Sequence, residues 1–256
     1  MNIHIINTHS LTMEQKKQID ELVLACCRND GIRLSYPLDL SEEDGEHFLL
    51  KGPDQKLLGV LGIVFYDSDT AECSAFVHPD YRRQGYFSRL LDRALTSCGE
   101  TDLLFPVSEA CSDTMAVLHS IGAELDYREH QMELLITPES IPDCMASALT
   151  LKPSSISGED TLWQLTHSPA PDAPPMGTCR TFLVSEGCVC LHQVEILPQL
   201  RGKGCGTAML RLLLPRLSRQ GIRRVILQVT DHNAPAMALY KKTGFRITET
   251  LSYYLY

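Results

Sequence analysis

A short segment near the end of the chain combines glycines with two basic side chains. Its residues are Arg201, Gly202, Lys203, Gly204, Cys205, Gly206 and Thr207. An apolar run typical of a strand precedes the segment and apolar residues at helical spacing follow it, so we expect the glycines where a strand turns into a helix. The first N–H groups of a helix lack intrahelical partners, and the helix dipole adds partial positive charge there. The segment is therefore a candidate anion site, with a phosphate group as the expected ligand.

The order of these residues disfavours two common phosphate-binding loops. Lys203 stands between the glycines rather than after the last one, so the segment lacks the nucleoside-triphosphate pattern Gly-x-x-x-x-Gly-Lys-Ser/Thr. It also lacks the dinucleotide pattern Gly-x-Gly-x-x-Gly. Another phosphate-containing ligand is therefore expected.

A second set of residues follows in the segment NAPAMALYKKTGF, with Asn233 at its start and Tyr240 in its middle. Together with the glycine segment, it resembles the Arg-x-x-Gly-x-Gly turn and the later helix of the Gcn5-related N-acetyltransferase family. The resemblance implies that Arg201 to Thr207 holds the pyrophosphate of acetyl-coenzyme A and that Asn233 contacts the arm of this co-substrate. It also implies that Tyr240 is the general acid that protonates the departing thiolate. The residues alone also allow Asn233 to be a helix N-cap and Tyr240 to be a packed aromatic side chain.

The strand before the glycine turn carries the candidates for the remaining chemistry. In the family, the arm of the co-substrate pairs with an exposed strand edge, and here that strand would be Val194, Glu195 and Ile196. A backbone N–H of this strand could polarise the carbonyl. Glu195 and His192 are the alternative general bases, acting on the amine directly or through water. A solvated carboxylate and a packed imidazole are the corresponding structural interpretations.

The same order of elements occurs twice. Tyr81-Arg82-Arg83-Gln84-Gly85-Tyr86-Phe87-Ser88 follows an earlier strand, and Arg82 precedes Arg201 by 119 residues (201 − 82). We therefore predict a duplicated domain, with residues 1–140 as the first copy and 141–256 as the second. The family resemblance implies an α/β (α+β) fold with two tandem domains, each a mixed, mostly antiparallel, splayed sheet flanked by helices.

The first copy departs from the family pattern. Phe87 stands where Gly206 stands in the second copy, Ser112 where Asn233 stands, and His119 where Tyr240 stands. We therefore expect the second copy to be the active one. The first copy is expected to be structural or to form part of the substrate cleft, and cofactor binding by it stays open. The second copy also has no counterpart of the helix predicted to begin at Thr12.

Composition limits the partners. The net charge is −9, and residues 1–137 contribute 11 − 23 = −12 whereas the rest contributes 12 − 9 = +3. An acidic first half disfavours nucleic acid and favours a cationic partner. No apolar run is long enough for a membrane span, and the start of the chain does not resemble a signal peptide, so we expect a cytoplasmic protein without membrane contact.

The cysteines do not indicate a disulfide framework or a zinc finger. Cys188, Cys190 and His192 alternate along one strand, but no fourth ligand is evident, so no metal is expected. The main hypothesis is an acetyl-coenzyme A-dependent N-acetyltransferase acting on a small, cationic amine, as a monomer or homodimer. The alternatives are a non-catalytic acyl-coenzyme A-binding or regulatory module and a protein or peptide N-acetyltransferase.

Overall fold

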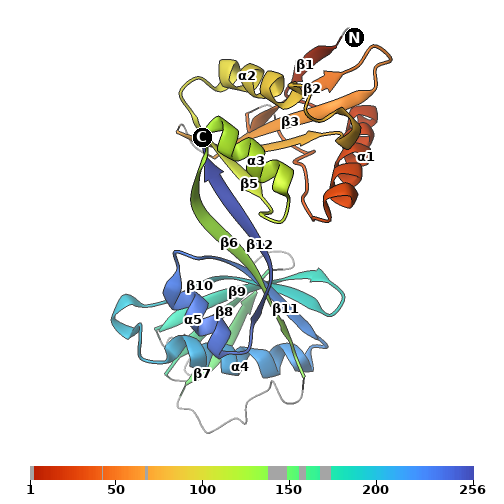
Figure 1. The fold of residues 1–256 in the computed structure, drawn as a ribbon. Coiled ribbons are helices and arrows are strands. Elements are labelled where there is room, and N and C mark those ends of the chain that lie inside the picture. The colour runs from red at the N-terminus through yellow and green to blue at the C-terminus, as the bar shows by residue number, and fades with distance from the viewer. Residues whose placement is uncertain (1–2, 42, 67–68, 138–148, 156–159, 168–173) are drawn as a thin grey trace. The chain divides into compact units, whose positions relative to one another are not determined.

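The computed structural model describes residues 3–41, 43–66, 69–137, 149–155, 160–167 and 174–256. These residues form two compact units, and Figure 1 shows the elements of both. Unit 1 comprises Met1–Tyr127 and Leu251–Tyr256, and unit 2 comprises Arg128–Thr250. Each unit is a sheet with helices packed against it, which confirms the predicted mixed α/β fold.

Unit 1 contains most of the first predicted copy. Its elements are β1 (His4–Thr8), α1 (Met13–Asp30), β2 (Gly45–Lys51), β3 (Leu57–Phe65), β4 (Thr70–Val77), the 3₁₀ turn η1 (Pro79–Tyr81), α2 (Tyr86–Cys98), β5 (Asp102–Val107) and α3 (Ser112–Ile121). The helix expected at Thr12 is confirmed: the Thr12 hydroxyl accepts from the Gln15 N–H, and the Gln15 side chain accepts from the Thr12 N–H.

Both faces of the unit 1 sheet are covered. Phe48 and Leu50 of β2 join one buried cluster, which includes residues of α2 and α3, while Leu49 between them joins a second cluster with α1. Successive side chains of a strand point to opposite faces. The helix α1 therefore covers one face, and α2 and α3 cover the other.

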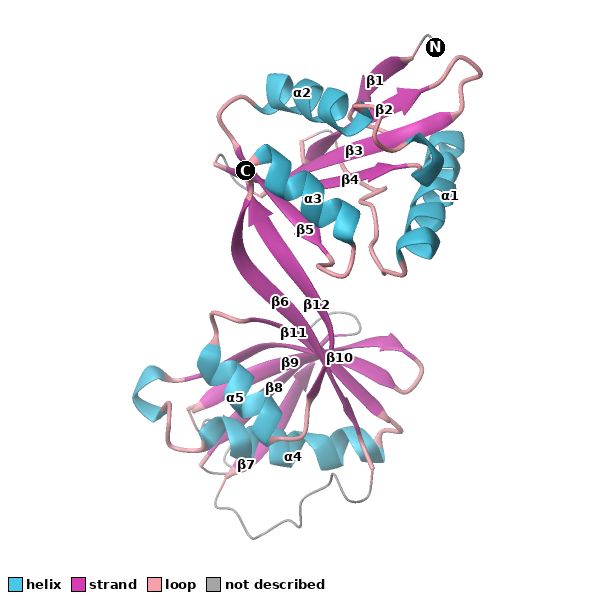
Figure 2. Ribbon diagram, viewed as in Figure 1, coloured by secondary structure: helices cyan, strands magenta, loops and turns pink. Residues whose placement is uncertain are grey.

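Unit 2 is built from the later elements. They are β7 (Thr150–Ser155), β8 (Asp160–Thr166), β9 (Gly177–Ser185), β10 (Cys188–Ile196), the 3₁₀ turn η3 (Pro198–Leu200), α4 (Cys205–Arg219), β11 (Arg224–Thr230) and α5 (Ala234–Lys242). One buried cluster lies on the face of the sheet that α4 and α5 cover, and it contains the only tryptophan of the chain, Trp163. Figure 2 shows these two helices against the strands of the unit.

The opposite face of the unit 2 sheet has no helix among the described residues. The first α-helix that the structure describes in this unit is α4, and its described residues contain no counterpart of α1. Phe182, on this face, keeps 39% of its surface exposed. We call this face, which carries Asp160, Arg180, Phe182 and His192, the open face of unit 2.

Two strands contribute residues to both units. The strand β6 (Glu124–Leu135) begins in unit 1, but its residues Glu129–Leu135 pair with β11 of unit 2. The strand β12 (Arg246–Leu255) begins in unit 2, and its residues Ser252–Leu255 pair with β5 of unit 1. The last strand of each copy therefore completes the sheet of the other, so the compact units differ from the sequence ranges 1–140 and 141–256.

The boundary predicted near Ile141 lies outside the described residues, and the division of the sequence at 140 stays a prediction. Within the described residues, no helix is both long and apolar enough to cross a membrane.

Candidate functional site

The predicted anion-binding turn lies at the start of α4 in unit 2. Gly202 has φ +72° and Gly204 has φ +83°, a left-handed conformation that glycine adopts without strain. Gly204 is the N-cap of α4, and no side chain caps this end of the helix. Its carbonyl accepts the first helical bond, from Ala208 at 3.0 Å. The sequence prediction of a glycine-rich strand-to-helix turn is therefore confirmed.

Several backbone N–H groups of this turn have no acceptor among the described residues. They belong to Gly202, Gly204, Cys205, Gly206 and Thr207, whereas the Lys203 N–H reaches the Leu200 carbonyl at 3.4 Å. Unpaired N–H groups and the positive end of the helix dipole provide the donors that a phosphate oxygen requires. The turn therefore has the geometry of an anion site.

Arg201 is anchored to the strand that precedes the turn. Its Nε donates to the carbonyl of Ile196 at 3.0 Å, and the side chain is exposed without a carboxylate partner among the described residues. The guanidinium therefore keeps donors for an anion beside the turn.

The strand β10 separates from β11 directly before this turn. The two strands pair in parallel only from Cys188 to Cys190, whereas β11 continues to pair with β6 as far as Thr230. The edge of β10 from Leu191 to Ile196 that faces β11 therefore has no strand partner among the described residues. This is the splayed sheet that the family resemblance implied.

A bulge interrupts β10 at Gln193. The register with β9 shifts between His192 and Glu195, and Gln193 has φ +48°, which is unusual for a residue other than glycine. Val194 and Ile196 pack against the cluster beneath α4 and α5, whereas Glu195 is exposed and His192 contacts residues of the open face. The bulge thereby places the two candidate bases on the side of the sheet away from α4 and α5.

Tyr240 lies on the covered side of the sheet. It is 6% exposed, and its ring centroid lies 5.6 Å from that of Phe245. Burial, with a smaller contribution from the nearby Cys179, raises the pKa of Tyr240 to about 12. The phenol therefore keeps its proton near neutral pH, as a general acid requires.

Asn233 and Gly206 connect α5 to the turn. The Asn233 side chain accepts from the Ala236 N–H at 3.2 Å, which confirms the predicted N-cap of α5. A Cβ on Gly206 would lie 3.0 Å from Cδ2 of Leu239, the neighbour of Tyr240. Because Gly206 has no side chain, α5 packs closely against the first turn of α4.

His192 belongs to a network that the sequence analysis did not identify. Its Nε2 lies 3.4 Å from Oδ1 of Asp160, and Oδ2 of Asp160 accepts from Nη1 of Arg180 at 3.2 Å. The ring of Phe182 packs edge-on against the imidazole, at 5.4 Å between centroids. Asp160 and Arg180 lie on β8 and β9, far from His192 in sequence, so only the sheet register brings them together.

The corresponding strand of unit 1, β4, also separates from its parallel neighbour β5, with which it pairs only from Thr70 to Glu72, but it lacks the bulge and the candidate bases of β10. The pairing of β3 with β4 runs without a register shift, and Phe76, the counterpart of Glu195 (195 − 119 = 76), is buried in the cluster with α1. The turn itself keeps its backbone shape, with Arg83 at φ +61° and Gly85 at φ +75°. Phe87 packs against Phe105, at 6.4 Å between ring centroids. Unit 1 therefore retains the backbone of the turn, but its strand has neither the bulge nor a candidate general base at the position of Glu195.

No group of three or more His, Cys, Asp or Glu side chains able to hold a metal occurs among the residues that the structure describes. Cys188 accepts from Nε of Arg224 at 3.3 Å, and burial raises the pKa of the Cys190 thiol. These cysteines thus have structural surroundings, and the expectation that no metal is bound stays a prediction.

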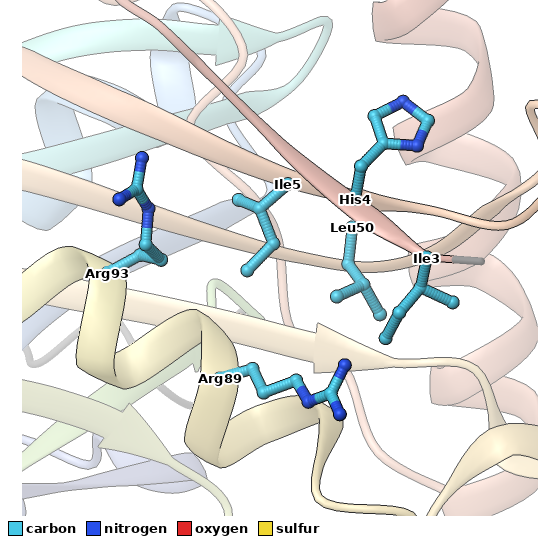
Figure 3. A pocket seen from close by; sticks show the side chains of 6 residues that line it. All are labelled: Ile3, His4, Ile5, Leu50, Arg89 and Arg93. Carbon is cyan, nitrogen blue, oxygen red and sulfur yellow. The ribbon is translucent and has the colours of Figure 1, made fainter. Parts of the chain in front are cut away.

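A pocket of about 260 Å³ lies in unit 1 between β1 and α2. Figure 3 shows Arg89 and Arg93 on α2, beside the apolar side chains of Ile3, Ile5 and Leu50. None of the site residues predicted from the sequence lines it.

Comparison with known proteins connects this geometry to a family. The profile of the acetyltransferase (GNAT) family matches residues 16–105 and again residues 141–245. A mycothiol acetyltransferase of Corynebacterium glutamicum (strain R) is 27% identical over 232 residues, covering 75% of this chain and 76% of the relative. The two matches of the family profile and this relative support a tandem architecture similar to that of mycothiol synthase.

Solved structures show the same fold over the whole chain. A GCN5-related N-acetyltransferase from Sphaerobacter thermophilus superposes with a TM-score of 0.76 at 15% identity, covering 98% of this chain and 95% of that one. A tandem GNAT protein from the clavulanic acid biosynthesis pathway gives a TM-score of 0.71 at 15% identity, with 100% and 98% covered. Both copies match the family and the tandem fold recurs in full-length neighbours, so the chain belongs to the acetyltransferase (GNAT) family and is an N-acetyltransferase with two domains in tandem.

Proposed function

We propose that unit 2 transfers an acetyl group from acetyl-coenzyme A to the amine of a small, cationic acceptor. The observation that carries the proposal is the row of N–H groups from Gly202 to Thr207, most of them unpartnered among the described residues, directly after the unpaired edge of β10. These two features fit the two parts of the co-substrate. The turn suits its pyrophosphate, and the strand edge suits the amides of its arm.

The residues of unit 2 fit this co-substrate. Arg201 and Lys203 are exposed cations at the turn, and Arg201 has no carboxylate partner among the described residues. Val194 and Ile196 turn their side chains to the core, so the backbone of the strand is available at its edge. Asn233, exposed at the start of α5, has an amide nitrogen left for a hydrogen bond after its oxygen caps the helix.

The chain supplies three functions to the transfer. When bound, acetyl-coenzyme A provides a thioester whose carbonyl carbon accepts the amine. An N–H of the bulged segment Gln193–Ile196 polarises the carbonyl, and His192 or Glu195 accepts the proton of the amine from the open face. Tyr240 holds the proton that the departing thiolate takes, because burial keeps the phenol protonated.

The charge of the open face supports a cationic acceptor. Glu195 is exposed and has no cationic partner among the residues that the structure describes. An exposed carboxylate attracts an ammonium group, and close to the thioester it would receive the proton that makes the amine nucleophilic. The relative reported above is named for mycothiol and not for a protein, which supports a small acceptor over a peptide.

The test is thiol release from acetyl-coenzyme A with a panel of amines, amino acids, aminoglycosides and peptides. For the fastest acceptor, Tyr240→Phe should lower kcat on the order of 10²-fold and leave the calorimetric affinity for acetyl-coenzyme A within about 2-fold. His119→Gln, at an exposed position of α3 in unit 1, is the control and should leave kcat unchanged, because the helix caps place the buried Leu118, and not His119 as expected from the sequence, at the position of Tyr240. Undiminished turnover in Tyr240→Phe would exclude the phenol as the acid. Tight cofactor binding without any acetylated amine would favour a binding module instead.

A further inference from the structure

We propose that Asp160 is a positioning residue that fixes the tautomer and orientation of His192 for proton transfer on the open face of unit 2. The proposal rests on the proposed function, because it gives His192 rather than Glu195 the role of general base. Asp160 does not belong to the turn or to the strand that the family resemblance identified, and it enters the site only through the register of β8 on β9.

The distances define an ordered chain of three side chains. Nε2 of His192 and Oδ1 of Asp160 are 3.4 Å apart, and both atoms are buried with no other partner among the described residues. Oδ2 of Asp160 is bonded to Nη1 of Arg180 at 3.2 Å. A buried polar atom without a hydrogen bond is costly, so the two unpartnered atoms are each other's natural partners after a small rotation.

This arrangement determines which nitrogen of His192 carries the proton. An ionised carboxylate only accepts hydrogen bonds, so Nε2 must be the protonated nitrogen of the neutral ring. Nδ1 makes no hydrogen bond with the described residues and, unlike Nε2, it is not buried, so it is accessible. The lone pair of His192 is therefore on Nδ1, the nitrogen that the acceptor amine can reach.

Arg180 and Phe182 limit the other motions of the network. Arg180 pairs with His192 in the β9–β10 register, and its guanidinium holds the second oxygen of Asp160. Phe182 pairs with Asp160 in the β8–β9 register, and its ring packs edge-on against the imidazole. The carboxylate thus bridges a fixed cation and a ring that is restrained on one side.

A purely structural ion pair would stabilise the sheet without affecting the tautomer, so Asp160→Asn separates the two roles. Arg180 has only donors and would take the oxygen of the new amide, which leaves the amide NH₂ facing Nε2 of His192. The ring would then carry its proton on Nδ1, which is the nitrogen that should accept the proton of the amine. We expect ¹⁵N NMR of the histidine side chains in the free protein to show a change of tautomer at His192, from Nε2–H to Nδ1–H.

Turnover gives the second readout, with acetyl-coenzyme A and the fastest amine of the panel as probes. Asp160→Asn should lower kcat at least about 10-fold with an unchanged affinity for acetyl-coenzyme A, because the base presents the wrong tautomer. The same substitution should have no further effect in a His192→Ala background, since residues that act through each other are not additive. Glu133→Gln, which removes the comparable pair with Arg224 at 3.5 Å on β6 and β11, should change neither readout.

The proposal would be overturned if Asp160→Asn leaves the tautomer of His192 unchanged. It would also be overturned if Asp160→Asn lowers kcat as much in the His192→Ala background as it does in the wild type. If His192→Ala leaves kcat unchanged while Tyr240→Phe lowers it, the positioning role is wrong and the acetyl transfer stands. If no amine of the panel is acetylated, the proposed function fails, whatever tautomer the NMR spectrum shows.

Discussion

The guanidinium of Arg82 donates two hydrogen bonds of 2.8 Å to the carboxylate of Asp30, the last residue of α1. Its Nε binds the Val77 carbonyl at 3.1 Å, as Nε of Arg201 binds the Ile196 carbonyl in the other copy. Each arginine is thus held by the same kind of hydrogen bond, to a carbonyl of the strand before its turn, but the remaining donors of the two guanidinium groups face different groups. In unit 1 they face a carboxylate of the chain itself, which α1 provides, and in unit 2 they remain open to an external anion.

Asp113 adds to this difference. One of its oxygens lies 3.5 Å from Nη1 of Arg82, and the other lies 3.6 Å from Nη2 of Arg83. Two carboxylates therefore surround the cations of the unit 1 turn, and both would repel a pyrophosphate. The duplication has kept the backbone of the turn in unit 1 while the side chains form an internal ion-pair network.

The first prediction concerns the cofactor stoichiometry and the turn that binds the cofactor. Titration calorimetry should give one acetyl-coenzyme A per chain. Gly204→Val should weaken binding at least about 10-fold, because a branched side chain is strained at φ +83° and blocks the adjacent N–H groups. Gly85→Val, at φ +75° in unit 1, introduces the same strain and should leave the affinity unchanged. A loss of affinity in Gly85→Val, or two sites per chain, would assign a cofactor to unit 1.

The second prediction concerns the stability of unit 1. Asp30→Ala should lower the free energy of unfolding by about 3 kcal/mol, because it leaves the largely buried Arg82 guanidinium without its main partner. Asp39→Ala removes the pair of an exposed carboxylate with Lys16 and should cost less than about 1 kcal/mol. Urea unfolding followed by circular dichroism measures both. Equal costs for the two variants would contradict the structural role of Asp30.

Much of the fold could be predicted from local patterns. The capping pair Thr12 and Gln15 and the glycines at 202 and 204 act through neighbouring residues, so their geometry is encoded within a few positions. The exchange of β6 and β12 could not be predicted in this way. Both strands have the pattern of a final strand, and nothing within Ser252–Leu255 distinguishes pairing with β5 from pairing within its own copy.

In the candidate site too, local motifs could be predicted from the sequence and contacts between distant strands could not. The turn, Asn233 and Tyr240 lie in contiguous motifs and could be identified from the sequence. The bulge at Gln193 has no local signal, because glutamine rarely adopts a positive φ. Asp160 meets His192 only after two strand pairings bring β8 and β10 to either side of β9. Contacts set by register need the whole sheet, so sequence spacing does not reveal them.

The third prediction tests the close approach of α5 to α4. A Cβ at position 206 would already lie 3.0 Å from Cδ2 of Leu239, so the larger side chain of Gly206→Leu must push α5 away together with Asn233 and Tyr240. We expect kcat to fall on the order of 10²-fold, because a shift of about 1 Å in a catalytic group has that effect. Arg211→Leu, at an exposed position of α4 outside the turn, is the control for a leucine on this helix. Equal turnover in wild type and Gly206→Leu would show that α5 can shift without consequence.

The fourth prediction concerns acid stability and His47 in unit 1. His47 is fully buried, and its Nδ1 lies 2.8 Å from the Tyr36 hydroxyl while Nε2 has no partner among the described residues. Burial, with smaller contributions from the charges of His9 and Lys16, lowers the pKa of His47 from 6.5 to about 4. The neutral ring is therefore the form that the folded unit accommodates.

The sign of the pH effect follows from proton binding. Between pH 6.5 and about 4 the unfolded chain protonates His47 and the folded chain does not, so stability is complete above pH 6.5 and falls by up to about 3 kcal/mol towards pH 4. His47→Asn cannot titrate and should lose less stability between pH 7 and pH 4.5 than wild type, as measured by circular dichroism in urea. His4→Gln, an exposed histidine of the same unit, should retain the full loss. Trp163 fluorescence follows unit 2 separately, so an identical acid response of wild type and His47→Asn would show that another group controls the acid stability of unit 1.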